Sequence, residues 1–202
     1  MCRLAAHNFP LLGLDHIQVH HADALEYLQE MEPVDCLFLD PARRDSHGGK
    51  TVAITECEPD VCALESLLVE KGRKVMVKLS PMLDMASALR DLKYIRELHV
   101  IAVNNECKEL TAVLYQMNSV NESSEKEVVI SCEQAVHNSL SEPFTYTLSE
   151  EKNAVCQLAD RVETYLYEPG AALLKAGPYR LLSQRYGVKK LHPNSHLYTS
   201  SV

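Results

Sequence analysis

Apolar runs and helix-like patterns alternate along the first 117 residues of the chain. The run VDCLFLD at 34–40 predicts a strand buried on both faces, and RKVMVKLSP at 73–81 predicts another strand. Between and after them, apolar residues at helical spacing predict helices over 59–72 and 82–92. This alternation is typical of a parallel sheet covered by helices, which is an α/β fold.

Two flanking segments extend the pattern. HIQVHHAD at 16–23 predicts a strand that ends in an acidic residue, and ALEYLQEM at 24–31 predicts a helix after it. Residues 95–117 predict two strands joined by a polar turn at 104–108. Strands joined by so short a turn run antiparallel.

The second part of the chain is smaller and has a different pattern. NSVNESSEKE at 118–127 is polar and predicts a linker. Beyond it, VVISCE and FTYTL predict strands, 151–170 predicts an amphipathic helix, and 178–187 predicts a second helix that a glycine ends. We therefore predict an α/β domain over 1–117 and a small α+β domain over 128–202.

Composition narrows the class of protein. With 46% hydrophobic and 24% charged residues, the chain has the composition of a soluble globular protein, and no apolar run reaches the ~20 residues of a membrane helix. Seven scattered cysteines without a C-x-x-C motif favour a reducing cytosol, so we predict a cytoplasmic protein. Cys57 and Cys62 lack a second ligand pair, and Pro193 interrupts the helical spacing of His192 and His196. We therefore predict no metal site.

The net charge of −8 is unevenly distributed. Residues 151–202 carry seven basic and four acidic residues, whereas residues 1–150 carry 13 basic and 24 acidic residues. A basic C-terminal part on an acidic body permits nucleic-acid contact, although a solvated helix flank would have the same composition. The basic and aromatic residues that would form an RNA surface are Tyr179, Arg180, Arg185, Lys189 and Lys190.

The stretch CLFLDPARRDSHGGKT at 36–51 fits two incompatible kinds of site. Its end, GGKT, looks like the close of a phosphate-binding loop, but the first glycine of such a loop would stand at Arg44. The following residues, VAITE, prefer a strand, whereas a phosphate loop opens a helix. These two conflicts exclude the nucleotide-binding loop.

The start of the same stretch fits a site at the edge of a sheet. Asp40, Asp23 and Ser80 each follow a predicted strand, and ligands of α/β sheets bind beyond the carboxyl ends of the strands. The two aspartates are alternatively ordinary turn residues or helix caps. Pro41 stiffens the turn after Asp40, which a plain cap would not require, so it favours a functional site.

Three long segments carry a family resemblance: residues 34–60, residues 74–84 (KVMVKLSPMLD) and residues 167–200. Together they resemble a bacterial family of class I S-adenosylmethionine-dependent methyltransferases that carry a C-terminal THUMP-like domain. The resemblance implies a partial Rossmann-like methyltransferase sheet, lacking the first βαβ unit, followed by a small α+β substrate-binding domain. It also implies S-adenosylmethionine as cofactor and RNA as the partner.

The resemblance assigns roles to particular residues. Asp40 and Pro41 stand where amino-methylating relatives grip the target amino group, so they would be catalytic. Asp23, with Ala24 after it, stands where class I enzymes contact the adenine of the cofactor. Catalysis by such a site rests mostly on positioning, because the methyl donor is already activated.

The residues around Asp40 and at the second strand end would contact the substrate. Arg43 replaces the aromatic residue that would stack on a target base, which puts base-amine methylation in doubt. Arg43 and Arg44 would neutralise a substrate phosphate, with an ion pair to Asp45 or Glu56 as the alternative. The remaining substrate contacts that we predict are Ala42, Ser80, Lys189 and Lys190. Ser80 stands where uridine-C5 methyltransferases have a nucleophilic cysteine, so that reaction is not expected.

The cofactor loop of class I enzymes is missing from the sequence. The chain has seven glycines and no G-x-G motif, and MCRLAAHNFPLL looks like the helix that follows the second strand in the family. We therefore expect a chain truncated at its N-terminus that is inactive by itself. The alternative is a non-catalytic RNA- or protein-binding module on a methyltransferase scaffold. The sequence gives no oligomeric state.

Overall fold

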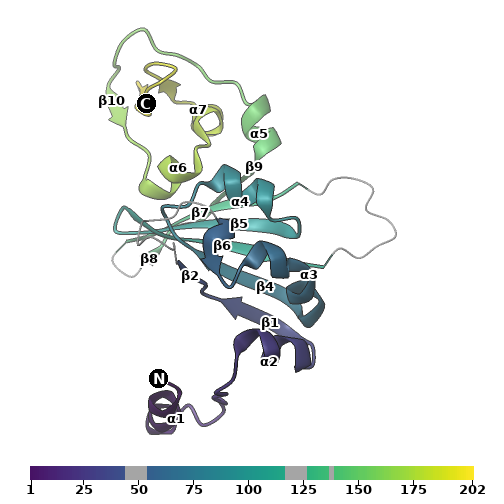
Figure 1. Ribbon diagram of the computed structural model, residues 1–202. Coiled ribbons are helices and arrows are strands. Elements are labelled where there is room, and N and C mark those ends of the chain that lie inside the picture. Colours follow the sequence, from purple (N-terminus) through teal and green to yellow (C-terminus); the bar gives the residue numbers. More distant parts are fainter. Residues whose placement is uncertain (44–53, 117–126, 137–138) are drawn as a thin grey trace. The chain divides into compact units, whose positions relative to one another are not determined.

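The computed structural model describes residues 1–43, 54–116, 127–136 and 139–202 (Figure 1). The chain forms two compact units, Met1–Pro33 and Val34–Val202. Arg44 and nearly all of the predicted linker lie outside the described residues. Among the described helices, none is long and apolar enough to cross a membrane.

The first unit is helical. It contains α1 (Cys2–Leu11) and α2 (Ala24–Glu30), both of which the sequence predicts. The strand that we predicted over 16–23 was wrong, because those residues form turns and coil. A strand needs a hydrogen-bonded neighbour, and residues 1–33, all of which are described, contain no strand that could pair with it.

The second unit is built on a mixed sheet. Its strand order begins β1 (Val34–Leu39), β4 (Gly72–Leu79), β6 (Glu106–Leu114), β5 (Ile95–Val103), β7 (Val129–Val136) (Figure 1). The two-residue strand β8 (Ser139–Leu140) and β9 (Phe144–Thr147) both pair with β7. β1 runs parallel to β4, whereas β6 runs antiparallel to both β4 and β5. The strands predicted at 34–40, 73–81 and 95–117 and the antiparallel pair are therefore confirmed. The burial of 34–40 on both faces was wrong, because β1 is an edge strand of the sheet and Phe38 is 62% exposed.

Helices cover the sheet and close its core. α3 (Val61–Lys71) packs on β4, and α4 (Met85–Asp91) connects β4 to β5. The buried side chains of the sheet include Val75, Val77, Leu98, Val100 and Leu110. With the small C-terminal part described below, this arrangement confirms the predicted α/β class, a partial Rossmann-like sheet followed by a small domain.

Two positions in this body show why particular residues are required. Gly72 is the last residue of the helix that we predicted over 59–72. Its φ of −122° needs no glycine, but a Cβ there would come within 2.9 Å of Leu37 Cγ. Glu65 of α3 is a buried acid, 2% exposed, that accepts bonds from the backbone N–H groups of Lys93 (3.1 Å) and Tyr94 (3.2 Å). This carboxylate ties α3 to the segment that leads into β5.

The sheet continues beyond the predicted linker. β7 pairs parallel with β5, with Leu98 opposite Ile130 and Val100 opposite Cys132. The first strand after residue 127 therefore belongs to the same sheet as the strands before it. The domain limits that we placed at 117 and 128 stay a prediction.

The C-terminal part, residues 148–202, is described throughout and contains three helices and a small antiparallel sheet. The helices are α5 (Leu148–Asn153), α6 (Ala171–Ala176) and α7 (Tyr179–Tyr186). The sheet has the order β10 (Tyr165–Tyr167), β12 (Tyr198–Ser200), β11 (Lys189–Lys190). The predicted helix over 178–187 is confirmed as α7, and Gly187 ends it at a left-handed φ of +65°.

The amphipathic helix predicted over 151–170 was wrong, because α5 ends at Asn153 and the chain then extends into β10. Two side chains of α7 accept hydrogen bonds from backbone N–H groups of the segment that we predicted to continue the helix beyond Asn153. Gln184 accepts a bond from the Val155 N–H at 2.8 Å, and Ser183 accepts one from the Gln157 N–H at 3.1 Å. These tertiary bonds override the local helical spacing.

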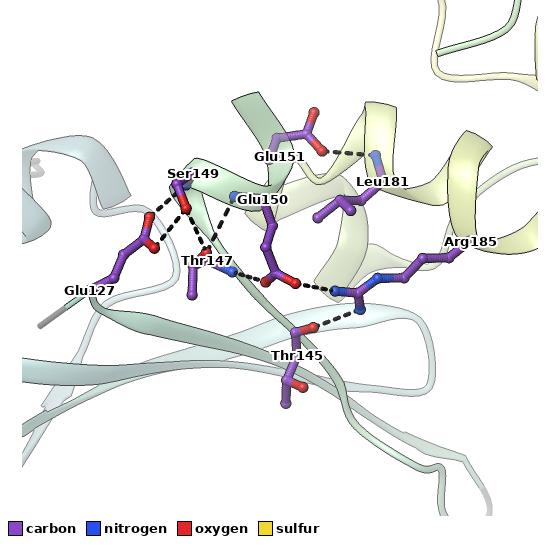
Figure 2. Close-up of polar contacts among 8 residues, drawn as sticks. All are labelled: Glu127, Thr145, Thr147, Ser149, Glu150, Glu151, Leu181 and Arg185. Carbon is purple, nitrogen blue, oxygen red and sulfur yellow. Dashed lines mark hydrogen bonds and ion pairs between the residues drawn. The ribbon is translucent and has the colours of Figure 1, made fainter. Parts of the chain in front are cut away.

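Polar contacts join α5 to α7 (Figure 2). Thr147 and Glu150 form a capping box at the start of α5, and Glu150 also pairs with Arg185 of α7 at 3.2 Å. Glu151 accepts a bond from the backbone N–H of Leu181 at 2.9 Å. The two helices are therefore locked together by carboxylates of α5.

Candidate functional site

The strongest candidate site lies at the carboxyl ends of β1 and β4. Asp40 directly follows β1, and its Oδ2 lies 2.8 Å from Lys78 Nζ of β4. The parallel register, with Leu39 opposite Val77, brings the two side chains side by side. They are partly exposed, at 58% for Asp40 and 39% for Lys78, so a ligand can reach the pair. The hydrogen bond to Asp40, with the charge of that carboxylate, raises the pKa of Lys78 above its ordinary value.

Ser80 lies at the same edge, because it directly follows β4. Its hydroxyl accepts a bond from the Met82 N–H at 3.1 Å, and its carbonyl accepts one from Leu83 N at 3.0 Å. The residue therefore starts a tight turn around Pro81. Because β1 and β4 are parallel neighbours, their carboxyl ends lie at the same edge of the sheet. Asp40 and Ser80, which follow these two strands, therefore lie at that edge together.

The backbone after Asp40 is held by a short ladder. β2 (Ala42–Arg43) pairs antiparallel with β3 (Cys57–Glu58), with Ala42 opposite Glu58. Pro41 is thus fixed between the end of β1 and this ladder. Arg44 lies outside the described residues, as does the side chain of Arg43, so their contact with a phosphate stays a prediction.

Asp23 lies in the first unit and caps α2. Its Oδ1 accepts bonds from Leu25 N at 2.9 Å and Glu26 N at 3.2 Å, and Ala24 is the first residue of the helix. Asp23 therefore makes the contacts of a helix cap, which was the alternative role that we considered for it. Its role and that of Ala24 toward a cofactor stay predictions.

The predicted RNA contacts of the C-terminal part lie in different environments. Lys189 pairs with Glu163 at 2.6 Å, and Arg185 pairs with Glu150. Lys190 is only 7% exposed, and its ammonium donates to the carbonyl of Pro193 at 2.7 Å. Contact of these residues with RNA stays a prediction.

Lys78 is a site residue that sequence reasoning missed. The signal was a single cation inside the otherwise apolar run VMVKL at 75–79, two residues before Ser80. Its partner could not be read from the sequence, because the contact with Asp40 spans 38 residues.

A polar row crosses the sheet from this pair. The registers place Lys78 opposite Thr111, Thr111 opposite His99, and His99 opposite Ser131. Residues paired across strands point to the same face, so these side chains share one face of the sheet with the Asp40 contact. The buried residues of β5 alternate with this row and point to the other face.

His99 is the centre of a network within this row that the sequence did not indicate. Its Nδ1 lies 2.6 Å from Glu133 and its Nε2 lies 3.1 Å from Glu97. Ser131 donates to Glu133 at 3.1 Å, and Tyr115 donates to Glu97 at 3.2 Å. Both ring nitrogens are thus engaged within the chain, and the network orders β5 and β7. Among the described residues, no group of three or more His, Cys, Asp or Glu side chains is arranged to hold a metal ion.

Comparison with known proteins gives two matches. Residues 165–202 match a family described as a ferredoxin-like domain, which covers β10 to β12. The whole chain matches a solved structure, described as a "putative methyltransferase from Porphyromonas gingivalis W83", at 36% sequence identity and a TM-score of 0.87. The alignment covers 100% of this chain and 49% of that chain, so the chain spans about half the length of that protein. No curated protein matches the chain.

These two matches show which kinds of protein the chain resembles in fold. At 36% identity along its full length, the chain is similar to a protein described as a methyltransferase, and it ends in a part similar to a ferredoxin-like domain. The predicted small α+β domain agrees with this C-terminal match. Its THUMP-like character stays a prediction.

Proposed function

We propose that the chain supplies the substrate-binding edge of an S-adenosylmethionine-dependent methyltransferase that acts on RNA. The observation that carries the proposal is the Asp40 carboxylate, held by Lys78 at the carboxyl ends of two parallel strands. Its support is the similarity of the whole chain to 49% of the Porphyromonas gingivalis protein.

Asp40 would align the target atom. Lys78 engages Oδ2 at 2.8 Å, which leaves Oδ1 to accept a hydrogen bond from a substrate amino group. The ion pair also restricts the rotamers of the Asp40 side chain, so the acceptor is positioned before substrate binds. Pro41 fixes the backbone carbonyl that would be the second acceptor.

The described residues fit one part of the cofactor. Both capping bonds of Asp23 end on Oδ1, and the residue is exposed, so its Oδ2 is available to accept a bond from an adenine amino group. Bound S-adenosylmethionine would supply an activated methyl group. The sequence contains no G-x-G loop, so we expect these 202 residues alone to bind the cofactor weakly and to be inactive.

RNA is the substrate class that the charge distribution supports. The last 52 residues are basic on an acidic body, and the predicted contacts Lys189 and Lys190 belong to that part. At the sheet edge, Ser80 and the arginines after Asp40 would contact the same substrate.

The test is a methyl-transfer assay with tritiated S-adenosylmethionine and total RNA from cells that lack the gene. The enzyme is the full-length product of the gene that encodes this chain. We expect label in RNA with the wild type, and a loss of about 10²-fold or more with Asp40→Ala, because catalysis rests on positioning.

Asp35→Ala is the matched control. Asp35 lies on the same strand, is 91% exposed, and pairs with Arg73 at 3.5 Å, far from the carboxyl end. This variant should keep wild-type transfer. If Asp40→Ala still transfers the methyl group at the wild-type rate, Asp40 is not part of the active site. If the wild type itself transfers no label, the non-catalytic binding module is favoured.

A further inference from the structure

The C-terminal part contains a pocket with two cationic side chains. The pocket has a volume of about 330 Å³ and is lined by Ala154, Cys156, Leu158, Arg180, Lys190 and Pro193. Among the described residues that line it, none carries a carboxylate. Its size falls at the lower end of the range of small-ligand sites.

Lys190 is the unusual member of this lining. Its side chain is buried, yet its described contacts are neutral: the carbonyl of Pro193 at 2.7 Å and the ring of Tyr179, 5.2 Å from the ammonium. The neighbouring Lys189, by contrast, is paired with Glu163 at 2.6 Å. A buried ammonium without a counter-ion is costly, so an anion beside it would be strongly favoured.

Arg180 adds a second cation to the same pocket. Its side chain is exposed and donates one bond, to the carbonyl of Lys152 at 3.3 Å. A guanidinium has five donors in a planar fork that matches the oxygens of a phosphate. Glu151, which contacts the backbone of Arg180, does not line the pocket, and both of its oxygens are engaged by backbone N–H groups.

We propose that this pocket binds a phosphate group, with Arg180 and Lys190 as its ligands. The apolar side of the pocket, formed by Ala154, Leu158 and Pro193, gives room for the organic part of a phosphate ester. Free phosphate and the terminal phosphate of a polynucleotide share this chemistry. The proposal does not depend on methyl transfer.

The first experiment titrates the 202-residue chain with inorganic phosphate and follows thermal unfolding, at constant ionic strength set with sodium chloride. We expect saturable stabilisation that chloride does not reproduce. Arg180→Ala should raise the dissociation constant for phosphate about tenfold or more, because a charged hydrogen bond is lost. Lys190→Met, which replaces the ammonium by an apolar group of similar length, should abolish the effect.

Arg161→Ala is the control, since Arg161 is an exposed arginine of the same part of the chain and does not line the pocket. It should bind phosphate as the wild type does. Because Arg180 is exposed, its variant is expected to fold even if Lys190→Met does not. Phosphate that fails to stabilise the wild type, or that stabilises Arg180→Ala and wild type equally, would overturn the proposal.

A second pair of titrations identifies the source of the phosphate. A short oligoribonucleotide is compared with and without a 5′-phosphate, on the wild type and on Arg180→Ala. Tighter binding of the phosphorylated form, lost in Arg180→Ala, assigns the pocket to a polynucleotide end. Equal binding of the two forms, with free phosphate still bound, assigns it to small phosphates. Either result is independent of the Asp40 assay, which measures methyl transfer.

Discussion

The contact between Glu151 and α7 should stabilise the C-terminal part measurably. Glu151 accepts bonds from the backbone N–H groups of Arg180 and Leu181, both at 2.9 Å (Figure 2 shows the second). These N–H groups belong to the first turn of α7, where no helical carbonyl can accept from them. We therefore treat Glu151 as a cap supplied by another helix.

The magnitude follows from what Glu151→Ala removes. Loss of a side-chain cap costs about 0.5–2 kcal/mol, and loss of a negative charge at a helix N-terminus costs about 0.3–1 kcal/mol. Leu181 is 4% exposed, so water cannot easily replace the carboxylate at its N–H. We expect Glu151→Ala to lower the free energy of unfolding by about 1–3 kcal/mol. Glu151→Gln, which keeps an acceptor but loses the charge, should lower it by about half as much.

Urea unfolding followed by circular dichroism measures these changes. Glu168→Ala is the control, because Glu168 is an exposed glutamate of the same region and its removal should change the free energy by less than about 0.5 kcal/mol. If Glu151→Ala is as stable as Glu168→Ala, the carboxylate does not cap α7. We also expect Glu151→Ala to weaken phosphate binding, because Arg180 lies in the first turn of α7, which Glu151 caps.

Two further predictions concern the body. Glu65→Ala removes a buried carboxylate that accepts two backbone hydrogen bonds, from Lys93 and Tyr94. It should lower the free energy of unfolding by about 2–4 kcal/mol in the same urea assay, and a loss below about 1 kcal/mol would contradict this role. Burial raises the pKa of Cys132 to about 12, so only about 10⁻⁴ of this thiol is ionised at pH 8, and iodoacetamide should label the exposed Cys36 long before Cys132. Peptide mass spectrometry that found equal labelling rates for the two cysteines in the folded protein would refute this.

The body strands were predictable because each contains a short run of apolar and β-branched residues, although β1 lies at the edge of the sheet and exposes Phe38. β1 and β4 are short and apolar, and the turn between β5 and β6 is short enough to force an antiparallel pair. The left-handed residues of that turn, Asn104 and Asn105, belong to a type that tolerates positive φ. In these segments the local pattern and the tertiary contacts agree.

The failed predictions are those in which distant partners decide the structure. Residues 16–23 have β-forming side chains, but their unit offers no strand to pair with. Residues 154–164 have helical spacing, yet Ser183 and Gln184 of α7 take the backbone N–H groups of this segment. Neither partner can be identified from the segment itself.

The same limit applies to the candidate sites. Asp40 could be predicted, because an acid at the end of an apolar strand marks the sheet edge, but its bond to Lys78 depends on which strand is the neighbour. At the other site, Lys189 and Lys190 are adjacent in one strand, and adjacent residues of a strand point to opposite faces. The two lysines therefore lie in different environments. The pairing of β11 with β12 puts Lys189 beside Glu163 and buries Lys190 in the pocket, where we place the phosphate.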